Sequence, residues 1–196
     1  NLGLVFHQQG DLEAAVAEYK KAIEIDPQHS AAYYCLGNIY KTQGNLEPAE
    51  VAYKNAIQIN PRDAGLHYNL GLVYHNLGDL EAAIVAYKNA IQINPKDAGA
   101  HYNLGIIYHS QEDLEAAVTE YKKAIQINPQ DANTHYCLGV AYRKLGDLEA
   151  AIVAYKNAIQ INPKDADAYH NLGLVYYSQG DLEAAVTEYK KAIQIN

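Results

Sequence analysis

The sequence predicts an all-α solenoid made of consecutive pairs of antiparallel helices. The first observation is an internal repeat. When the chain is aligned with itself at an offset of 34 residues, five prolines fall in register, namely Pro27, Pro61, Pro95, Pro129 and Pro163. A fixed period of this length is typical of stacked supersecondary units. The second observation is that small and bulky residues recur in the same register at helical spacing. The third is a turn signal that separates two helical segments within a repeat.

Each repeat is expected to consist of helix A, a turn, helix B and a linker that ends near the proline. In the third repeat, Gly78 ends helix A, Asp79 accepts N–H bonds as the N-cap of helix B, and Glu81 favours the positive helix end. Lysines near the end of helix B, such as Lys122, suit its negative end. Pro48 lies in the first turn of its helix, where it removes no intrahelical bond.

Small residues recur where the two helices of a pair must approach closely. They are Gly3, Gly37, Gly71, Gly105, Gly139 and Gly173, then Ala15, Ala49, Ala83, Ala117, Ala151 and Ala185, then Ala22, Ala56, Ala90, Ala124, Ala158 and Ala192. Bulky residues recur beside them, including the tyrosines Tyr19, Tyr53, Tyr87, Tyr121, Tyr155 and Tyr189. Alternating knobs and holes at this spacing predict helix-on-helix packing.

The residues at these repeated positions resemble the pattern of the tetratricopeptide repeat family over the entire chain. Two positions depart from the family pattern. Leucine replaces the Tyr that opens helix B, and the usual Trp is replaced by Tyr33, His67, His101, His135 and Tyr169. The resemblance implies one right-handed superhelical solenoid over residues 1–196, with repeats at about 1–29 (partial), 30–63, 64–97, 98–131, 132–165 and 166–196. It also implies that helix A lines a concave groove and that the array binds proteins or peptides.

Composition excludes several other function classes. The net charge of −8 and the sequence pI of 5.4 oppose a nucleic-acid partner. No apolar run is long enough to cross a membrane. No nucleophile, base and orienter set and no metal-ligand spacing emerges, so we expect neither an enzyme nor a bound metal or cofactor. Cys35 and Cys137 are expected to be free thiols, which favours a reducing, cytoplasmic compartment.

The charge distribution favours a mildly acidic ligand. The helix A segments have a net charge of +2, which leaves −10 for the rest of the chain; their charged residues are Lys41, Arg143, Lys144 and Asp167. All histidines except His29 also lie on helix A, so the groove is expected to become more positive below about pH 6.5. The alternative is that a groove crowded by helices simply avoids unpaired carboxylates.

An asparagine row occupies one repeated position of helix A, at Asn1, Asn69, Asn103 and Asn171, and Cys35 and Cys137 interrupt it. This row resembles the asparagine ladder in the tetratricopeptide region of O-GlcNAc transferases and kinesin light chains. A carboxamide can donate to a peptide C=O and accept from its N–H, and so hold an extended ligand without reading its side chains. The alternatives are solvated polar filler and simple inheritance by repeat duplication.

Two further rows flank the asparagines. An aromatic row consists of Tyr34, Tyr68, Tyr102, Tyr136 and His170. It either contacts ligand side chains or bridges adjacent helices. A basic row contains Lys41, His75, His109 and Arg143, with His7 and Tyr177 at its ends. This basic row is a candidate site for acidic side chains or a terminal carboxylate.

The sequence therefore predicts a protein-binding or peptide-binding scaffold whose concave groove holds an extended segment. Two alternatives remain. The array is either a substrate-recruiting region of a larger enzyme, such as a glycosyltransferase, or a homotypic assembly module. The second alternative follows from the terminal repeats, which are expected to expose apolar faces that include Ile193 and Ile195 and so to stack end to end. We also expect the parent chain to contain more repeats.

Overall fold

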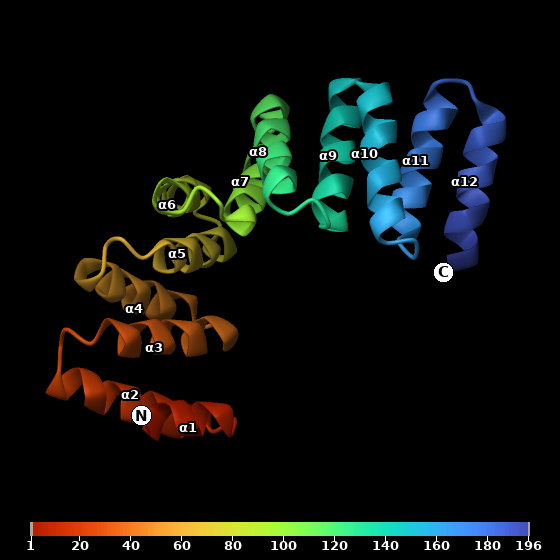
Figure 1. Ribbon diagram of the computed structural model, residues 1–196. Helices are drawn as coiled ribbons and strands as arrows, with labels where there is room; N and C mark the ends of the chain where they lie inside the picture. The colour runs from red at the N-terminus through yellow and green to blue at the C-terminus, as the bar shows by residue number, and fades with distance from the viewer. Residues whose placement is uncertain (1, 196) are drawn as a thin grey trace. The chain divides into compact units, whose positions relative to one another are not determined.

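The computed structural model describes residues 2–195, and within that range it contains twelve α-helices and no strand. The helices are α1 (Leu2–Gln8), α2 (Leu12–Ile25), α3 (Ser30–Thr42), α4 (Leu46–Ile59), α5 (Ala64–Leu77), α6 (Leu80–Ile93), α7 (Ala98–Ser110), α8 (Leu114–Ile127), α9 (Ala132–Leu145), α10 (Leu148–Ile161), α11 (Ala166–Ser178) and α12 (Leu182–Ile195). The predicted all-α class is confirmed (Figure 1). Odd-numbered helices correspond to helix A and even-numbered helices to helix B.

Successive helices pack as antiparallel pairs, each joined by a short turn (Figure 1). Within each unit, a helix B also packs against the helix A of the following pair, as α4 does against α5 and α8 against α9. The chain divides into two compact units, one that ends at Pro95 and one that begins at Lys96. We refer to them as unit 1, with helices α1–α6, and unit 2, with helices α7–α12.

The turns between helix A and helix B have the predicted chemistry. Gly78 has φ 80°, a left-handed conformation that glycine adopts without steric cost, and it ends α5. The Asp79 carboxylate accepts a hydrogen bond from the backbone N–H of Ala82 at 3.0 Å. In the fourth repeat the glycine position is held by Glu112, whose φ is 61°. Its carboxylate pairs with the Lys144 ammonium of α9 at 3.0 Å.

A tyrosine from helix B packs on a glycine of helix A in every pair, which explains why both recur. The ring carbon of Tyr155 lies 2.7 Å from the position that a Cβ on Gly139 would occupy, and the same close approach joins Tyr87 to Gly71. Any side chain at these glycines would overlap the ring. The tyrosine rings at positions 53, 87, 121 and 155 are fully buried.

The hydroxyl groups of these tyrosines differ in their partners. The Tyr53 hydroxyl donates to the Asn38 side-chain oxygen at 2.7 Å. The hydroxyl of Tyr87 is equally buried but has no hydrogen-bond partner, because the position that corresponds to Asn38 is Leu72 in its repeat. Burial raises the pKa of Tyr53 and Tyr87 alike. The repeated core thus contains a polar atom that only one of these two repeats satisfies.

Two of the histidines at the usual tryptophan position, His67 and His135, bind to backbone. Nε2 of His67 donates to the Pro61 carbonyl oxygen at 3.0 Å, and Nε2 of His135 donates to the Pro129 carbonyl oxygen at 3.1 Å. A carbonyl only accepts, so Nε2 carries the proton in both rings. The two histidines therefore fasten helix A to the linker that precedes it.

Candidate functional site

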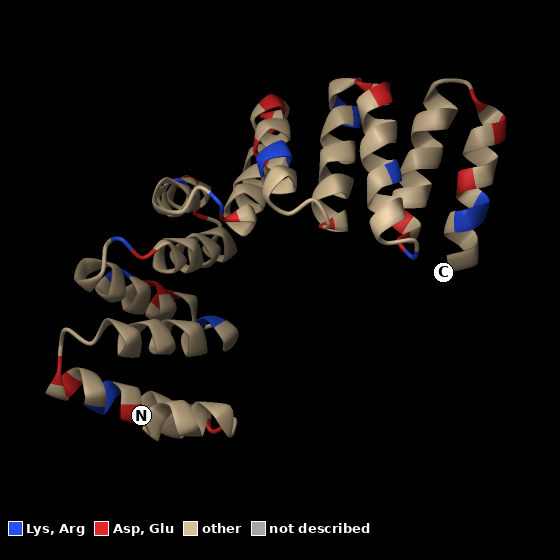
Figure 2. Ribbon diagram, in the orientation of Figure 1, with Lys and Arg blue, Asp and Glu red and all other residues tan. Residues whose placement is uncertain are grey.

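The helix A side is the surface on which the sequence predicts binding. In unit 2, α9 packs against both α7 and α11, so these three helices present their rows next to each other. Charged residues are sparse on the odd-numbered helices and frequent on the even-numbered helices and turns (Figure 2). The structure thus agrees with a weakly charged helix A side.

The asparagines of the predicted ladder bond to their own helices. Nδ2 donates to the carbonyl four residues earlier at Asn69, Asn103 and Asn171, with distances of 2.8, 2.9 and 2.9 Å. One amide hydrogen of each side chain is therefore already used, and Asn69 is only 9% exposed. Asn1 lies outside the described residues. The sequence-based picture of free carboxamides is too simple, although binding of a ligand by this row stays a prediction.

The aromatic row packs against helix B within each pair. The ring centroids of Tyr34, Tyr68, Tyr102, Tyr136 and His170 lie 6.3, 5.9, 6.1, 5.9 and 5.5 Å from those of Tyr53, Tyr87, Tyr121, Tyr155 and Tyr189. The row also joins neighbouring helices, since the Tyr136 hydroxyl accepts from Asn171 Nδ2 at 3.0 Å. The bridging role that the sequence left open is therefore present, and Tyr34 remains 38% exposed.

The basic row contains two cations without a carboxylate partner. Within residues 2–195, no ion pair involves Lys41 of α3 or Arg143 of α9. The Lys41 ammonium instead donates to the Asn69 side-chain oxygen, and burial lowers the pKa of Lys41. His75 is half-buried in the last turn of α5.

One histidine of the basic row becomes cationic at a lower pH than the sequence predicts. Burial, followed by the positive charge of Lys144, lowers the pKa of His109 from its ordinary value. His109 therefore becomes cationic only below about pH 6.5, the value for an unperturbed ring. His67 and His135 do not serve the groove, because they line hollows on the helix B side.

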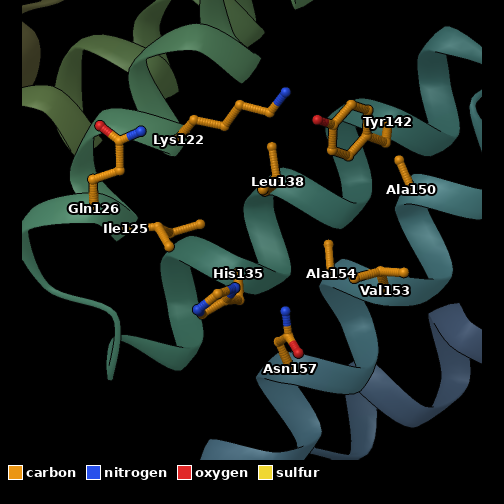
Figure 3. A pocket seen from close by; sticks show the side chains of 10 residues that line it. All are labelled: Lys122, Ile125, Gln126, His135, Leu138, Tyr142, Ala150, Val153, Ala154 and Asn157. Atoms are coloured by element: carbon orange, nitrogen blue, oxygen red, sulfur yellow. The ribbon is translucent and has the colours of Figure 1, made fainter.

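Two equivalent hollows, which we call slots, lie on the helix B side, where two successive helices B flank the intervening helix A. The first slot, in unit 1, has a volume of 450 Å³ and is lined by Lys54, Ile57, Gln58, His67, Leu70, Tyr74, Ala82, Val85, Ala86 and Asn89. The second slot, in unit 2, has a volume of 490 Å³ and is lined by Lys122, Ile125, Gln126, His135, Leu138, Tyr142, Ala150, Val153, Ala154 and Asn157 (Figure 3). All ten lining residues are identical between the two.

Sequence reasoning missed these slots. The signal was an apolar residue at an exposed helix B position: Val85 and Val153 are each 59% exposed, whereas the equivalent residue of α8 is Thr119. The Thr119 hydroxyl donates to the Glu115 carbonyl at 3.0 Å, so that surface is polar and internally satisfied. A surface valine where other repeats tolerate threonine marks an apolar site.

No group of three or more potential metal ligands lies together among residues 2–195. No helix in this range is long and apolar enough to cross a membrane. Both thiols, Cys35 and Cys137, are free, and burial raises the pKa of Cys137.

Comparison with known families identifies the repeats. The family model of the cilia and flagella-associated protein 70 C-terminal domain, a tetratricopeptide repeat domain, matches residues 1–196. The chain belongs to this tetratricopeptide repeat family. No curated protein sequence matches the chain significantly. Family membership and a structural neighbour of related sequence support a role as a protein-interaction scaffold.

Solved structures resemble this tetratricopeptide repeat array along most of its length. A crystal structure of MamA is 31% identical, covers 82% of this chain and 94% of its own, and gives a TM-score of 0.79. YrrB, a TPR protein with an unusual peptide-binding site, is 24% identical over 91% of this chain and 92% of its own, with a TM-score of 0.80. A tetratricopeptide repeat protein from Parabacteroides merdae is 22% identical over 99% and 77%, with a TM-score of 0.81.

Proposed function

We propose that the array is a non-catalytic scaffold whose helix A side holds an extended, mildly acidic peptide segment of another protein. The observation that carries this proposal is the pair of helix A cations, Lys41 and Arg143, that no carboxylate neutralises within the described chain. By contrast, Lys144, the residue beside Arg143, is paired with Glu112. A guanidinium without an acidic partner favours a carboxylate ligand, to which it can donate two parallel hydrogen bonds.

The other rows support the same proposal in a secondary way. The carboxamide oxygen of Asn171 accepts from an extended backbone while its nitrogen stays bonded to Asp167 and Tyr136. The exposed edge of Tyr34 in unit 1 and the exposed ring of His170 in unit 2 offer flat contact surfaces to ligand side chains. Each such hydrogen bond contributes only about 1 kcal/mol, so recognition requires several contacts at once.

Selection of peptides from a random display library tests the proposal. We expect the selected sequences to be enriched in Asp and Glu, and their affinity to fall roughly 10- to 150-fold in Arg143→Gln, because one charge-assisted contact contributes roughly 1.5–3 kcal/mol. Lys144→Gln is the matched control, since its ammonium is already paired, and it should change affinity little. Peptides without acidic residues, or equal losses in both variants, would refute an acidic ligand. Asn171→Ala separately tests the asparagine row.

A second candidate function is self-association through the terminal helices. Leu182 and Ile193 of α12 are 59% and 75% exposed, and Leu2 of α1 is 53% exposed. Apolar faces of this kind are covered by a neighbouring repeat elsewhere in an array. Sedimentation at increasing protein concentration should give masses above that of one chain, and Ile193→Lys should restore the monomer. A constant monomeric mass in the unsubstituted chain would exclude this function.

A further inference from the structure

The two slots on the helix B side are identical in their lining but differ in whether their lysine is paired with a carboxylate. In the first slot, the Lys54 ammonium pairs with the Glu50 carboxylate at 2.6 Å. In the second slot, the residue that corresponds to Glu50 is Val118, which is buried. No ion pair among residues 2–195 involves Lys122. The second slot therefore has a cation at its rim that is not neutralised.

The position of that cation is fixed by the slot itself. The Lys122 ammonium lies over the Tyr142 ring, 5.4 Å from its centroid, at one end of the slot (Figure 3). The floor between is aliphatic, with Leu138 from α9 and Ala154 and Val153 from α10. His135 and Asn157 lie together at the end away from Lys122 (Figure 3). The slot thus has an apolar middle, a positive end and a polar end.

The exposure of the slot indicates what kind of ligand it takes. Val153 is 59% exposed, so the slot is shallow. Sites for small molecules enclose most of their ligand, whereas a shallow apolar slot covers one side chain of a larger partner. Burial of such a side chain against aliphatic residues is favourable by about 25 cal/mol for each Å² of apolar surface removed from water.

We propose that the second slot, and more weakly the first, binds one bulky apolar side chain of a partner protein that carries a carboxylate directly beside it. The apolar side chain lies on Leu138 and Val153, and the carboxylate pairs with Lys122. This surface is separate from the helix A side, so the partner occupies it independently of any peptide held there. The polar end, at Asn157, supplies a donor and an acceptor for the partner backbone.

A third hollow serves as an internal control. It lies in unit 1, has a volume of 410 Å³ and is lined by Tyr33, Leu36, Tyr40, Glu47, Pro48, Val51, Ala52 and Asn55. Its lining includes Val51, which is 59% exposed like the valines of the two slots. It includes the carboxylate of Glu47 and no cation, so it should repel a ligand with a negative charge.

N-acetyltryptophan and its uncharged amide are suitable probes, because they differ only in the carboxylate. Their binding can be followed by the NMR shifts of the valine methyl groups, and the chain has no tryptophan of its own to interfere with probe fluorescence. We expect N-acetyltryptophan to bind at millimolar concentration and to shift Val153 most, Val85 less and Val51 least. The preference for the second slot over the first should be roughly two- to fivefold, as for an exposed ion pair, and should disappear with the amide.

Substitutions within the chain separate the charge effect from the apolar contact. Glu50→Val copies unit 2 and should raise the affinity of the first slot to that of the second. Arg62→Gln is the matched control, since it copies Gln130, another charge difference between the two units, and should leave the preference unchanged. Val153→Asp should abolish binding to the second slot, and Val153→Thr, which copies α8, should weaken it without altering the fold.

Several results would overturn the proposal. These are the absence of any probe shift at Val153, equal binding of the acid and the amide in both slots, or equalisation by Arg62→Gln instead of Glu50→Val. A shift of the Val153 methyl groups with protein concentration alone would assign the slot to a second copy of the chain. None of these outcomes bears on Arg143, so failure here leaves the peptide-binding proposal to its own test.

Discussion

Replacement of single tyrosine hydroxyls should have opposite effects in two repeats of the same chain. Tyr53→Phe removes the hydrogen bond to Asn38 and should cost about 1 kcal/mol, a typical net value for such a bond. Tyr87→Phe removes a buried hydroxyl that has no partner, so it should stabilise the chain by about 1 kcal/mol, since an unsatisfied buried group costs about 1–3 kcal/mol. The free energies of unfolding of the two variants should thus differ by about 2 kcal/mol.

Urea unfolding followed by circular dichroism measures this difference. Both rings lie in unit 1, and removal of a hydroxyl group leaves the helices intact. At about 2–4 °C per kcal/mol, the midpoints of thermal unfolding should differ by roughly 4–8 °C. In an Asn38→Leu background, which copies Leu72, Tyr53→Phe should behave like Tyr87→Phe, and the double-mutant cycle isolates the bond. Equal destabilisation by Tyr53→Phe and Tyr87→Phe would refute the reasoning, since it would show that the hydroxyl of Tyr87 is satisfied.

Three further outcomes are expected. Gly139→Ala places a Cβ 2.7 Å from the Tyr155 ring and should lower the thermal midpoint, with an overpacking cost of about 1–3 kcal/mol; an unchanged midpoint contradicts the tight fit. Burial raises the pKa of Tyr155 to about 12, above about 10 in the unfolded chain. The folded state holds this proton more tightly, so the stabilising contribution is complete below about pH 10 and is lost as the pH rises toward 12; Tyr155→Phe should make the alkaline loss, followed by circular dichroism, shallower. Asp79→Ala should cost about 1 kcal/mol in urea unfolding, whereas Asn45→Ala should cost much less because its side chain makes no cap bond, and equal costs would contradict the cap assignment.

Features that are local in sequence were predicted well. The caps at Gly78 and Asp79 depend on a few adjacent residues, and the contact of Tyr155 with Gly139 depends on a fixed helical period. Helices α3, α5, α7, α9 and α11 begin at Ser30, Ala64, Ala98, Ala132 and Ala166, which are the first residues of the predicted repeats. Local propensity and periodicity agree in such an array, so the sequence specifies the helices with little ambiguity.

Features that depend on side-chain geometry between helices were not predicted. From the sequence, the Asn69 carboxamide has two candidate partners, a ligand and its own helix. Only the structure shows that it donates to the Gly65 carbonyl oxygen. The second slot brings together three helices from two repeats, and its exposed Val153 is a common kind of surface residue when considered alone. Recognition of such a site requires the distance between Lys122 and Tyr142, which no residue pattern encodes.

The antiparallel pairing of neighbouring helices also has a consequence for how the chain folds. The helices that pack most closely in the described chain, such as α5 with α6 and α9 with α10, are neighbours in the sequence. Their contacts close only short loops, so the entropy that must be lost before contacts form is small and the relative contact order is low. Folding can begin at any of these pairs and spread to the next. The speed of assembly therefore depends on the stability of single helix pairs, and not on a search that joins distant parts of the chain.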